Sequence, residues 1–447
     1  MHEPVYSIHK PAEHETGPQW ARQLASTIGT GLLAYAASYT SSILVARVLG
    51  PRLFGDYSAT ISSLTLLTVT VLFGWDGGLS QFIPGYVKQR DYAGVRGYIA
   101  LSIKRLRNIN IFIFVAGIVA MVALYALTNE HILDIRHTHP FYFYCWGVPL
   151  LVALSYISKY IRAAGYAHFY LIITSAGIPI VVLAAIAGFI TFIRKFTLAE
   201  ALLIYFSASI IVSSIGVFYC YKKGELRLIR SQAPRFETKT WIGATRALFF
   251  LAMALGYQTN ILMIATSALD HDKKGAGLIA ASISIVGVMW IIGGAVRALM
   301  APKITVAVVE KNRKQIRDLV FRSTATLAGS CGIVLLTILF FGRGWLGHFG
   351  EEFRSGYPIL VALASAWYLG ALCGPATWAV TRSTKLKEFT YFSTALFVVS
   401  TVAICFATSF LGSGGAIAVY AVVQVIMTAY SLSLLVQILR ETPAEGA

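Results

Sequence analysis

The sequence carries little charge for its length. Of its 447 residues only 13% are charged and 57% are hydrophobic, and the mean hydropathy is +0.68. A soluble domain carries roughly 25% charged residues. This chain cannot cover a water-exposed surface with charge, so much of its outside must face lipid.

The sequence also has few cysteines, and it shows neither the pattern of a cleaved signal peptide nor a nucleotide-binding motif. The five cysteines lie in or beside apolar segments without metal-ligand spacing, so we expect small core residues and no metal or other cofactor. Residues 1–22 are polar and precede no short apolar core with a cleavage site, so the first span should serve as an uncleaved signal. No Gly-x-x-x-x-Gly-Lys motif is present, so energy would come from gradients, membrane potential or downstream polymerisation.

Apolar runs about 20 residues long recur along the chain, and that length crosses the hydrocarbon core as a helix. Helices also satisfy their backbone groups within one segment, as lipid requires. The predicted fold class is therefore all-α and polytopic, with about 12 transmembrane helices. The expected spans are 24–46, 58–83, 108–128, 141–161, 168–192, 199–221, 242–268, 277–301, 321–342, 357–381, 388–409 and 413–437.

The net charge of +17 follows membrane topology. With the N-terminus inside, 27 of the 37 Lys and Arg residues lie on the cytoplasmic side and nine on the outer side. The acidic residues are nearly balanced, 11 inside against eight outside. This asymmetry predicts an inner-membrane protein with both termini cytoplasmic, and it argues against nucleic acid as a partner.

Two halves of the sequence match at an offset near 220 residues. In each half a span ends at a proline, Pro84 or Pro302, and a basic amphipathic stretch follows. Each half has an even number of spans, so the repeats should be parallel, with substrate between them. The predicted organisation is a cytoplasmic tail (1–22), an N-terminal six-helix lobe (23–221), a cytoplasmic linker (222–241), a C-terminal six-helix lobe (242–437) and a cytoplasmic tail (438–447).

Several motifs resemble the polysaccharide transporter family, the O-antigen and exopolysaccharide flippases of the multidrug/oligosaccharidyl-lipid/polysaccharide superfamily. The segments that carry the resemblance are Ala46-Arg47-Val48-Leu49-Gly50-Pro51, Phe54-Gly55-Asp56-Tyr57-Ser58, Phe73-Gly74-Trp75-Asp76-Gly77-Gly78-Leu79, Gln258-Thr259-Asn260, Ala301-Pro302-Lys303 and the turn from Gly412 to Ala416. The resemblance implies a V-shaped, two-lobed transporter without enzymatic activity. It would carry a polyprenyl-diphosphate-linked oligosaccharide to the outer leaflet by alternating access. Membrane lipids and a polysaccharide polymerase or chain-length machinery would be further partners.

Two ionisable residues lie well inside predicted spans. Asp76 is 21 residues after Gly55, and Arg297 is 20 after Gly277, so the duplication places them at similar depth. Buried charges in a membrane usually face a partner or a cavity. One hypothesis is that Asp76 and Arg297 pair when the cytoplasmic side is closed. The alternative places Asp76 at a helix break formed by Gly74, Gly77 and Gly78, while Arg297 snorkels to the cytoplasmic face.

Polar side chains on the equivalent spans 1 and 7 are the second set of candidates. Span 1 offers Tyr35, Ser38, Tyr39 and Ser42 at helical spacing, and span 7 offers Gln258 and Asn260. These groups suit either a glycan-binding cavity or hydrogen bonds between helices. Basic residues at the cytoplasmic ends of spans could collect anionic headgroups at a portal or only set topology; they are Lys159, Arg162, Arg382 and Lys385.

Two other function classes remain open. A cation-coupled multidrug exporter would share the layout, but it is expected to hold an acid in span 1 or 7, and residues 24–46 and 242–268 contain neither Asp nor Glu. A membrane-embedded enzyme would need catalytic groups in a sizeable outer loop. The segments 129–140 and 343–356 show no acid, base or nucleophile constellation, so no catalytic residue is expected.

Overall fold

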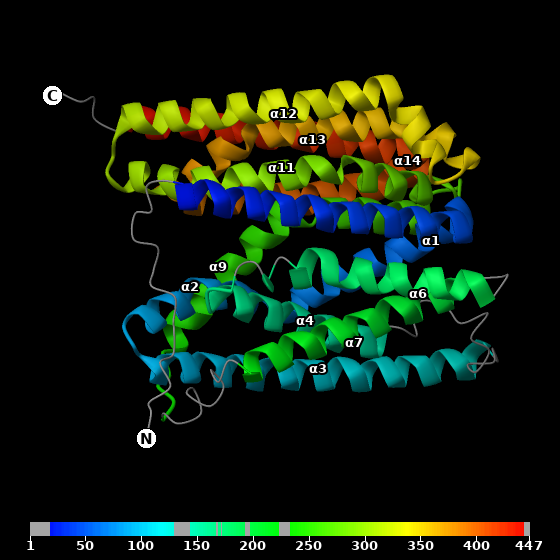
Figure 1. Ribbon diagram of the computed structural model, residues 1–447, viewed down its shortest axis with the longest axis horizontal. Helices are drawn as coiled ribbons and strands as arrows, with labels where there is room; N and C mark the ends of the chain where they lie inside the picture. The colour runs from blue at the N-terminus through cyan, green and yellow to red at the C-terminus, as the bar shows by residue number, and fades with distance from the viewer. Residues whose placement is uncertain are drawn as a thin grey trace. The chain divides into compact units, whose positions relative to one another are not determined.

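The computed structural model describes residues 18–128, 144–166, 169–170, 172–192, 197–222 and 233–441, which form helices joined by short turns and segments without strands (Figure 1). The elements in chain order are α1 (Pro18–Leu72), α2 (Trp75–Lys88), α3 (Tyr92–Thr128), α4 (Tyr144–Ala163), a π-helix η2 (Ile172–Gly177), α6 (Ile178–Phe192), α7 (Leu198–Lys222), α9 (Thr238–Gly256), α10 (Gln258–Leu269), α11 (Gly275–Val309), α12 (Arg313–Gly347), a short 3-10 helix η3 (Glu351–Gly356), α13 (Tyr357–Val380) and α14 (Leu386–Glu441). The described residues of all twelve predicted spans lie on these elements, except 73–74, 169–170, 257 and 381.

Six helices of the described chain are long and apolar enough to cross a membrane, or seven if the bent pair α9 and α10 forms one span. Two of the six are longer than one crossing requires, because α1 has 55 residues and α14 has 56. A straight helix of that length would measure about 80 Å, against about 30 Å for the hydrocarbon core. Each of these two helices therefore contains enough residues for two spans.

Both long helices contain a reversal at a glycine with positive φ, Gly50 (φ 71°) in α1 and Gly412 (φ 65°) in α14. In α1, Tyr39 and Phe54 both lie about 6 Å from Phe349, with ring-centroid distances of 5.7 and 6.3 Å. In a straight helix their Cα atoms would be about 22 Å apart. The chain therefore turns back at Gly50, as the sequence predicted for the boundary between spans 1 and 2.

The chain divides into two compact units. Unit 1 contains the described residues of Met1–Ala34, Leu64–Ala185 and Leu202–Phe249, and unit 2 contains those of Tyr35–Ser63, Ile186–Ala201 and Phe250–Ala447. Unit 2 thus includes the hairpin of α1, which belongs to the first half of the sequence. The predicted division into lobes at residues 222–241 stays a prediction, and half of that linker, residues 223–232, lies outside the described residues.

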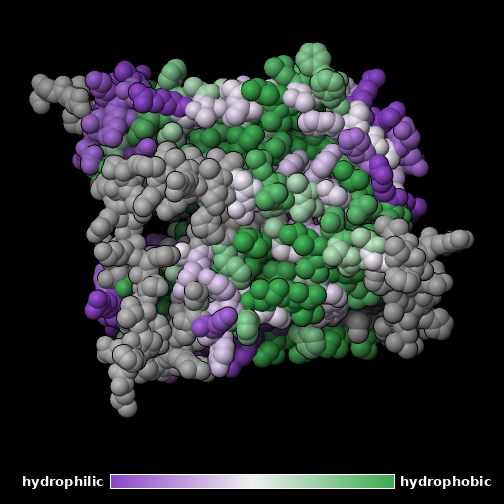
Figure 2. All heavy atoms as spheres, viewed as in Figure 1, coloured by the Kyte–Doolittle hydropathy of each residue, from purple (hydrophilic) through white to green (hydrophobic). Residues whose placement is uncertain are grey.

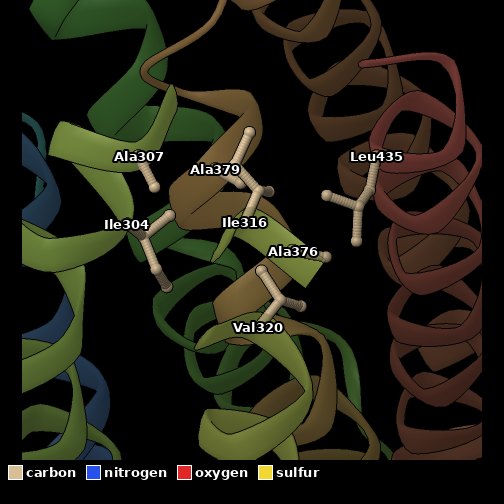
Figure 3. Close-up of a cluster of buried hydrophobic side chains, with 7 residues drawn as sticks. All are labelled: Ile304, Ala307, Ile316, Val320, Ala376, Ala379 and Leu435. Carbon is tan, nitrogen blue, oxygen red and sulfur yellow. The ribbon is translucent and has the colours of Figure 1, made fainter. Parts of the chain in front are cut away.

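Unit 2 is held together where α11, α12, α13 and the second arm of α14 meet (Figure 3). Their buried contact consists of Ile304, Ala307, Ile316, Val320, Ala376, Ala379 and Leu435. The three alanines allow close approach of the helices, and small interface residues are the usual means of helix association in lipid. In unit 1, α2, α3 and α4 pack against one another.

Candidate functional site

A helix break in unit 2, between α9 and α10, carries one candidate site. Helix α9 ends at Gly256, Tyr257 leaves the helical conformation (φ −118°, ψ 6°), and α10 starts at Gln258 with a bend of 59°. A break at membrane depth frees backbone groups, which must be buried in protein or line a polar cavity. Broken spans of transporters place such groups at substrate and ion sites.

Polar side chains meet beside this break. Gln258 is buried, and its Oε1 accepts a hydrogen bond of 3.1 Å from Nε2 of Gln424 on α14. The buried Tyr420 lies one turn before Gln424, and its hydroxyl lies among the side chains of Thr259, Trp367 and Gln424. We call Gln258, Thr259, Tyr420 and Gln424 the amide network. It is uncharged, so it suits neutral hydrogen-bonding groups.

The sequence identified Gln258 but missed Gln424 and Tyr420. A signal was present, because Gln424 is an amide within the apolar span 413–437. Buried amides need partners, and a second amide in another span is a natural one. Asn260, also predicted, donates through Nδ2 to the carbonyl oxygen of Ser62 on α1 at 3.3 Å. Asn260 therefore joins two helices of unit 2.

The polar stripe of span 1 lies in the first arm of α1. The Tyr35 hydroxyl lies 2.9 Å from the carbonyl oxygens of both Ser284 and Ile285 on α11, so these two acceptors share its hydrogen. Tyr35 stacks on Tyr39 at 5.9 Å. These contacts favour the interhelical alternative for Tyr35. Ser38 and Ser42 are half-buried on the same arm, and for them both alternatives stay open.

Asp76 occupies the first turn of α2 in unit 1. The helical chain is interrupted before it at Phe73 (φ 43°) and Gly74 (φ 79°). A Cβ at Gly74 would lie 2.1 Å from the carbonyl oxygen of Thr245 on α9, so both the backbone conformation and the close approach require glycine. The predicted helix break is present, and an acid at a helix N-terminus is favoured by the helix dipole.

Buried tyrosines surround this helix start. The fully buried Tyr98 donates to the carbonyl oxygen of Trp75 at 2.7 Å, and the Tyr156 hydroxyl is hydrogen-bonded to Ser102. Asp76 interacts electrostatically with both Tyr98 and Tyr156. The half-buried acid is thus close enough to two buried tyrosines to interact with them, and the hydrogen bonds of these tyrosines go to Trp75 and Ser102.

The remaining predicted residues belong to different parts of the chain. Arg297 is exposed on α11 in unit 2, whereas Asp76 is in unit 1, and their pairing stays a prediction. Among the basic portal candidates, Arg162 lies over the ring of Tyr170 at 5.4 Å, and Lys385 forms an ion pair with Glu441 at 2.9 Å. Lys159 is half-buried and Arg382 is exposed. Their role as a portal also stays a prediction.

The two helix breaks, at Gly74 and at Tyr257, do not lie on spans that the internal duplication makes equivalent. Span 2 is interrupted at Gly74, but its predicted equivalent is the continuous helix α11, which runs for 35 residues through Arg297. Span 7 is interrupted at Tyr257, but its equivalent in the first half is helical up to Gly50. Each half therefore breaks a different helix. Within the described chain, no group of three or more His, Cys, Asp or Glu side chains is placed to hold a metal ion.

Several solved structures have a similar fold. No profile of a known protein family matches the sequence, and no curated protein matches it. One similar structure is described as the inward-facing conformation of a multidrug resistance MATE family transporter of the MOP superfamily; it is 12% identical, with a TM-score of 0.72 over 94% of this chain and 100% of that chain. A MATE structure in a bent conformation is 12% identical, with a TM-score of 0.60 over 94% of this chain and 96% of that chain.

A third similar structure, described only as protein A, is 14% identical, with a TM-score of 0.63 over 96% of this chain and 98% of that chain. Identities this low establish the fold alone. The predicted fold class is confirmed: this is an all-α polytopic membrane protein with the fold of a MOP superfamily transporter.

Proposed function

We propose that this protein is an exporter that moves an amphipathic organic substrate across the membrane in exchange for a cation. The observation that carries the proposal is the fold, which matches a multidrug transporter over nearly the whole of both chains. The inner membrane, with both termini in the cytoplasm, is part of the proposal, because the distribution of Lys and Arg supports it.

The proposal needs an acidic side chain that binds the coupling cation, and predicted spans 1 and 7 contain neither Asp nor Glu. Asp76 meets this need at another place. It is a half-buried carboxylate beside buried tyrosines, and embedded acids are the usual ion sites of transporters. Ser80 lies one turn further along α2, and its buried hydroxyl has no hydrogen-bond partner in the described chain. The carboxylate can take up a proton, and the carboxylate and hydroxyl oxygens on one helix face can together coordinate a sodium ion.

A second candidate function is favoured by the amide network. Gln258, Tyr420 and Gln424 offer neutral donors and acceptors, which fit sugar hydroxyls better than a cationic drug. The neutral network and the resemblance of the sequence to polysaccharide flippases together favour a polyprenyl-diphosphate-linked oligosaccharide as substrate. In that case a polysaccharide polymerase or chain-length machinery would act on the product.

Transport in proteoliposomes tests the first proposal. The wild-type protein should move a cationic dye against a proton or sodium gradient, and Asp76→Asn should lose the gradient-driven component while retaining its fold. The matched control is Asp318→Asn, which removes another half-buried acid, near the start of α12, that forms an ion pair with Arg317. Equal gradient-driven transport by the wild type and Asp76→Asn would remove Asp76 from the coupling step.

The same vesicles distinguish the two substrates. If the wild type moves no dye under either gradient but translocates a labelled polyprenyl-diphosphate oligosaccharide, the flippase replaces the exporter. Dye transport without lipid translocation would instead exclude the second candidate.

A further inference from the structure

One end of unit 2 is formed by four turns. The Arg47 side chain, just before Gly50, donates to the carbonyl oxygen of His348 at 2.6 Å. Lys274 pairs with Glu352 of η3 at 3.2 Å, and the carboxylate of Asp270 reaches the turn at Gly412. We call this the Gly50 end of unit 2. The positive-inside analysis assigns it to the outer side of the membrane.

A hollow of about 670 Å³ opens at this end, where α12 passes through η3 into α13. Its lining contains two arginines, Arg343 from α12 and Arg354 from η3, together with Ser355 and Tyr357. These residues belong neither to the proposed cation site at Asp76 nor to the amide network. Two arginines that line one hollow offer charge-assisted hydrogen bonds to an anion, and planar guanidinium groups match the oxygen atoms of phosphate.

Local structure holds both arginines in place. The Arg343 guanidinium lies over the Tyr357 ring at 5.1 Å, and the Tyr357 hydroxyl is anchored on the carbonyl oxygen of Leu339 at 2.8 Å. Arg354 lies against Gly347, where a Cβ would come within 2.9 Å of Nε. The glycine thus leaves the space that the guanidinium occupies. Gly344 also lines the hollow, and a Cβ there would meet nothing within 4 Å.

An existing ion pair does not saturate the site. Arg354 contacts Glu351 through one nitrogen at 3.0 Å, and these side chains are 54% and 77% exposed. An exposed pair of this kind contributes little free energy. A guanidinium has five N–H donors, so Arg354 keeps donors for a second acceptor.

The surface next to the hollow indicates which anion would bind. The side chains of α12 just before Arg343 are apolar and exposed, with Phe340 at 79% and Phe341 at 63%. Figure 2 shows apolar side chains over the middle of the upper helices and hydrophilic ones at their ends. Arg343 follows these exposed phenylalanines near the end of α12 and lies over the Tyr357 ring, a position that fits the level of lipid headgroups.

We propose that Arg343, Arg354 and Tyr357 form a binding site for the phosphate of an anionic phospholipid, whose acyl chains lie along the exposed face of α12. The phosphate accepts hydrogen bonds from both guanidinium groups in the hollow. The ring of Tyr357 holds Arg343 at the height of the headgroup. A lipid bound at this place would stabilise the junction of α12, η3 and α13.

Native mass spectrometry of the purified full-length protein with short-chain phosphatidylglycerol tests the proposal. Changing both arginines (Arg343→Gln with Arg354→Gln) should weaken lipid binding at least about tenfold, because two charge-assisted contacts are lost. The control Lys274→Gln removes a cation at the same end that does not line the hollow, and it should bind like wild type. Equal loss in the control, or no loss in the double variant, would overturn the proposal.

Two further measurements sharpen the outcome. The double variant with Arg343→Lys and Arg354→Lys retains both charges and should keep more of the binding than the glutamine variant, which separates lost charge from altered folding. Inorganic phosphate should not compete at millimolar concentration, since it lacks acyl chains. Competition by phosphate would make this a site for free anions and reject the lipid. Binding is measured without transport, so failure here leaves the proposed function untouched.

Discussion

The carboxylate of Asp270 accepts a hydrogen bond of 3.1 Å from the backbone N–H of Ser413, which joins the turn after α10 to the reversal inside α14. Its other oxygen accepts from the N–H of Asp272 at 3.1 Å, and Asp270 is only 3% exposed. One buried acid therefore satisfies two backbone donors from segments about 140 residues apart.

Asp270→Ala should destabilise the protein by roughly 2–4 kcal/mol, because it leaves these two donors unsatisfied. Thermal unfolding in detergent measures the effect. Asp272→Ala is the matched control: Asp272 is exposed and receives one local bond from the Lys274 N–H, so its loss should cost less than about 1 kcal/mol. Similar unfolding midpoints for the two variants would contradict the role of Asp270.

Gly277→Ala should destabilise unit 2 by about 1–3 kcal/mol, since the added Cβ would lie 1.8 Å from the carbonyl oxygen of Pro51 and force α11 away from the α1 hairpin. The control Gly293→Ala lies on the same helix, where a Cβ meets nothing within 4 Å. It should be neutral or stabilising by up to about 1 kcal/mol. A destabilised Gly293→Ala would show that α11 tolerates no added methyl group.

Single and double variants separate the contribution of the amide network to stability from its contribution to transport. Gln258→Leu or Gln424→Leu alone should cost about 1–3 kcal/mol, because each breaks the hydrogen bond between the two amides and places an apolar side chain beside the remaining one. The double change should recover much of that stability. If the amides bind substrate, the recovered double variant still transports poorly. Wild-type transport by the double variant would assign the pair to helix association alone.

Charge reversal tests the pairing predicted for Asp76 and Arg297. Asp76→Arg and Arg297→Asp should each reduce transport, whereas the double reversal should restore part of it if the two side chains meet during the cycle. The measurement is substrate movement in proteoliposomes at equal protein content. A double reversal no better than either single reversal rejects the pairing and leaves Asp76 its place at the start of α2.

The hydrogen bond from Lys385 to Glu441 raises the pKa of the Lys385 ammonium above its ordinary value. A raised pKa in the folded state means that the pair stabilises the fold below the unfolded pKa of lysine and loses this effect as pH rises through the folded pKa. The unfolding midpoint of Lys385→Met should therefore lie below that of the wild type at pH 7, and the difference should shrink by about pH 11. Lys387→Met, which changes an exposed lysine, is the control; a constant difference for Lys385→Met would contradict the linkage.

The helices of this protein follow from its sequence because the membrane leaves few alternatives. Apolar runs of the right length must be helical in lipid, and glycine marks the places where the chain turns or breaks, as at Gly50, Gly74 and Gly412. The sequence also singled out Asp76, Gln258 and Asn260, because polar groups within apolar spans are rare.

Only the tertiary structure decided what those side chains contact. The partner of Gln258 is 166 positions away, and the acceptors of the Tyr35 hydroxyl are about 250 away. Such pairs depend on how each helix is rotated and how deeply it packs, and hydropathy does not encode either, since several faces of a membrane helix are equally apolar. The hollow lined by Arg343 and Arg354 has the same origin, because η3 and the packing of Arg354 against Gly347 place on one hollow two charges that the sequence shows only as loop residues.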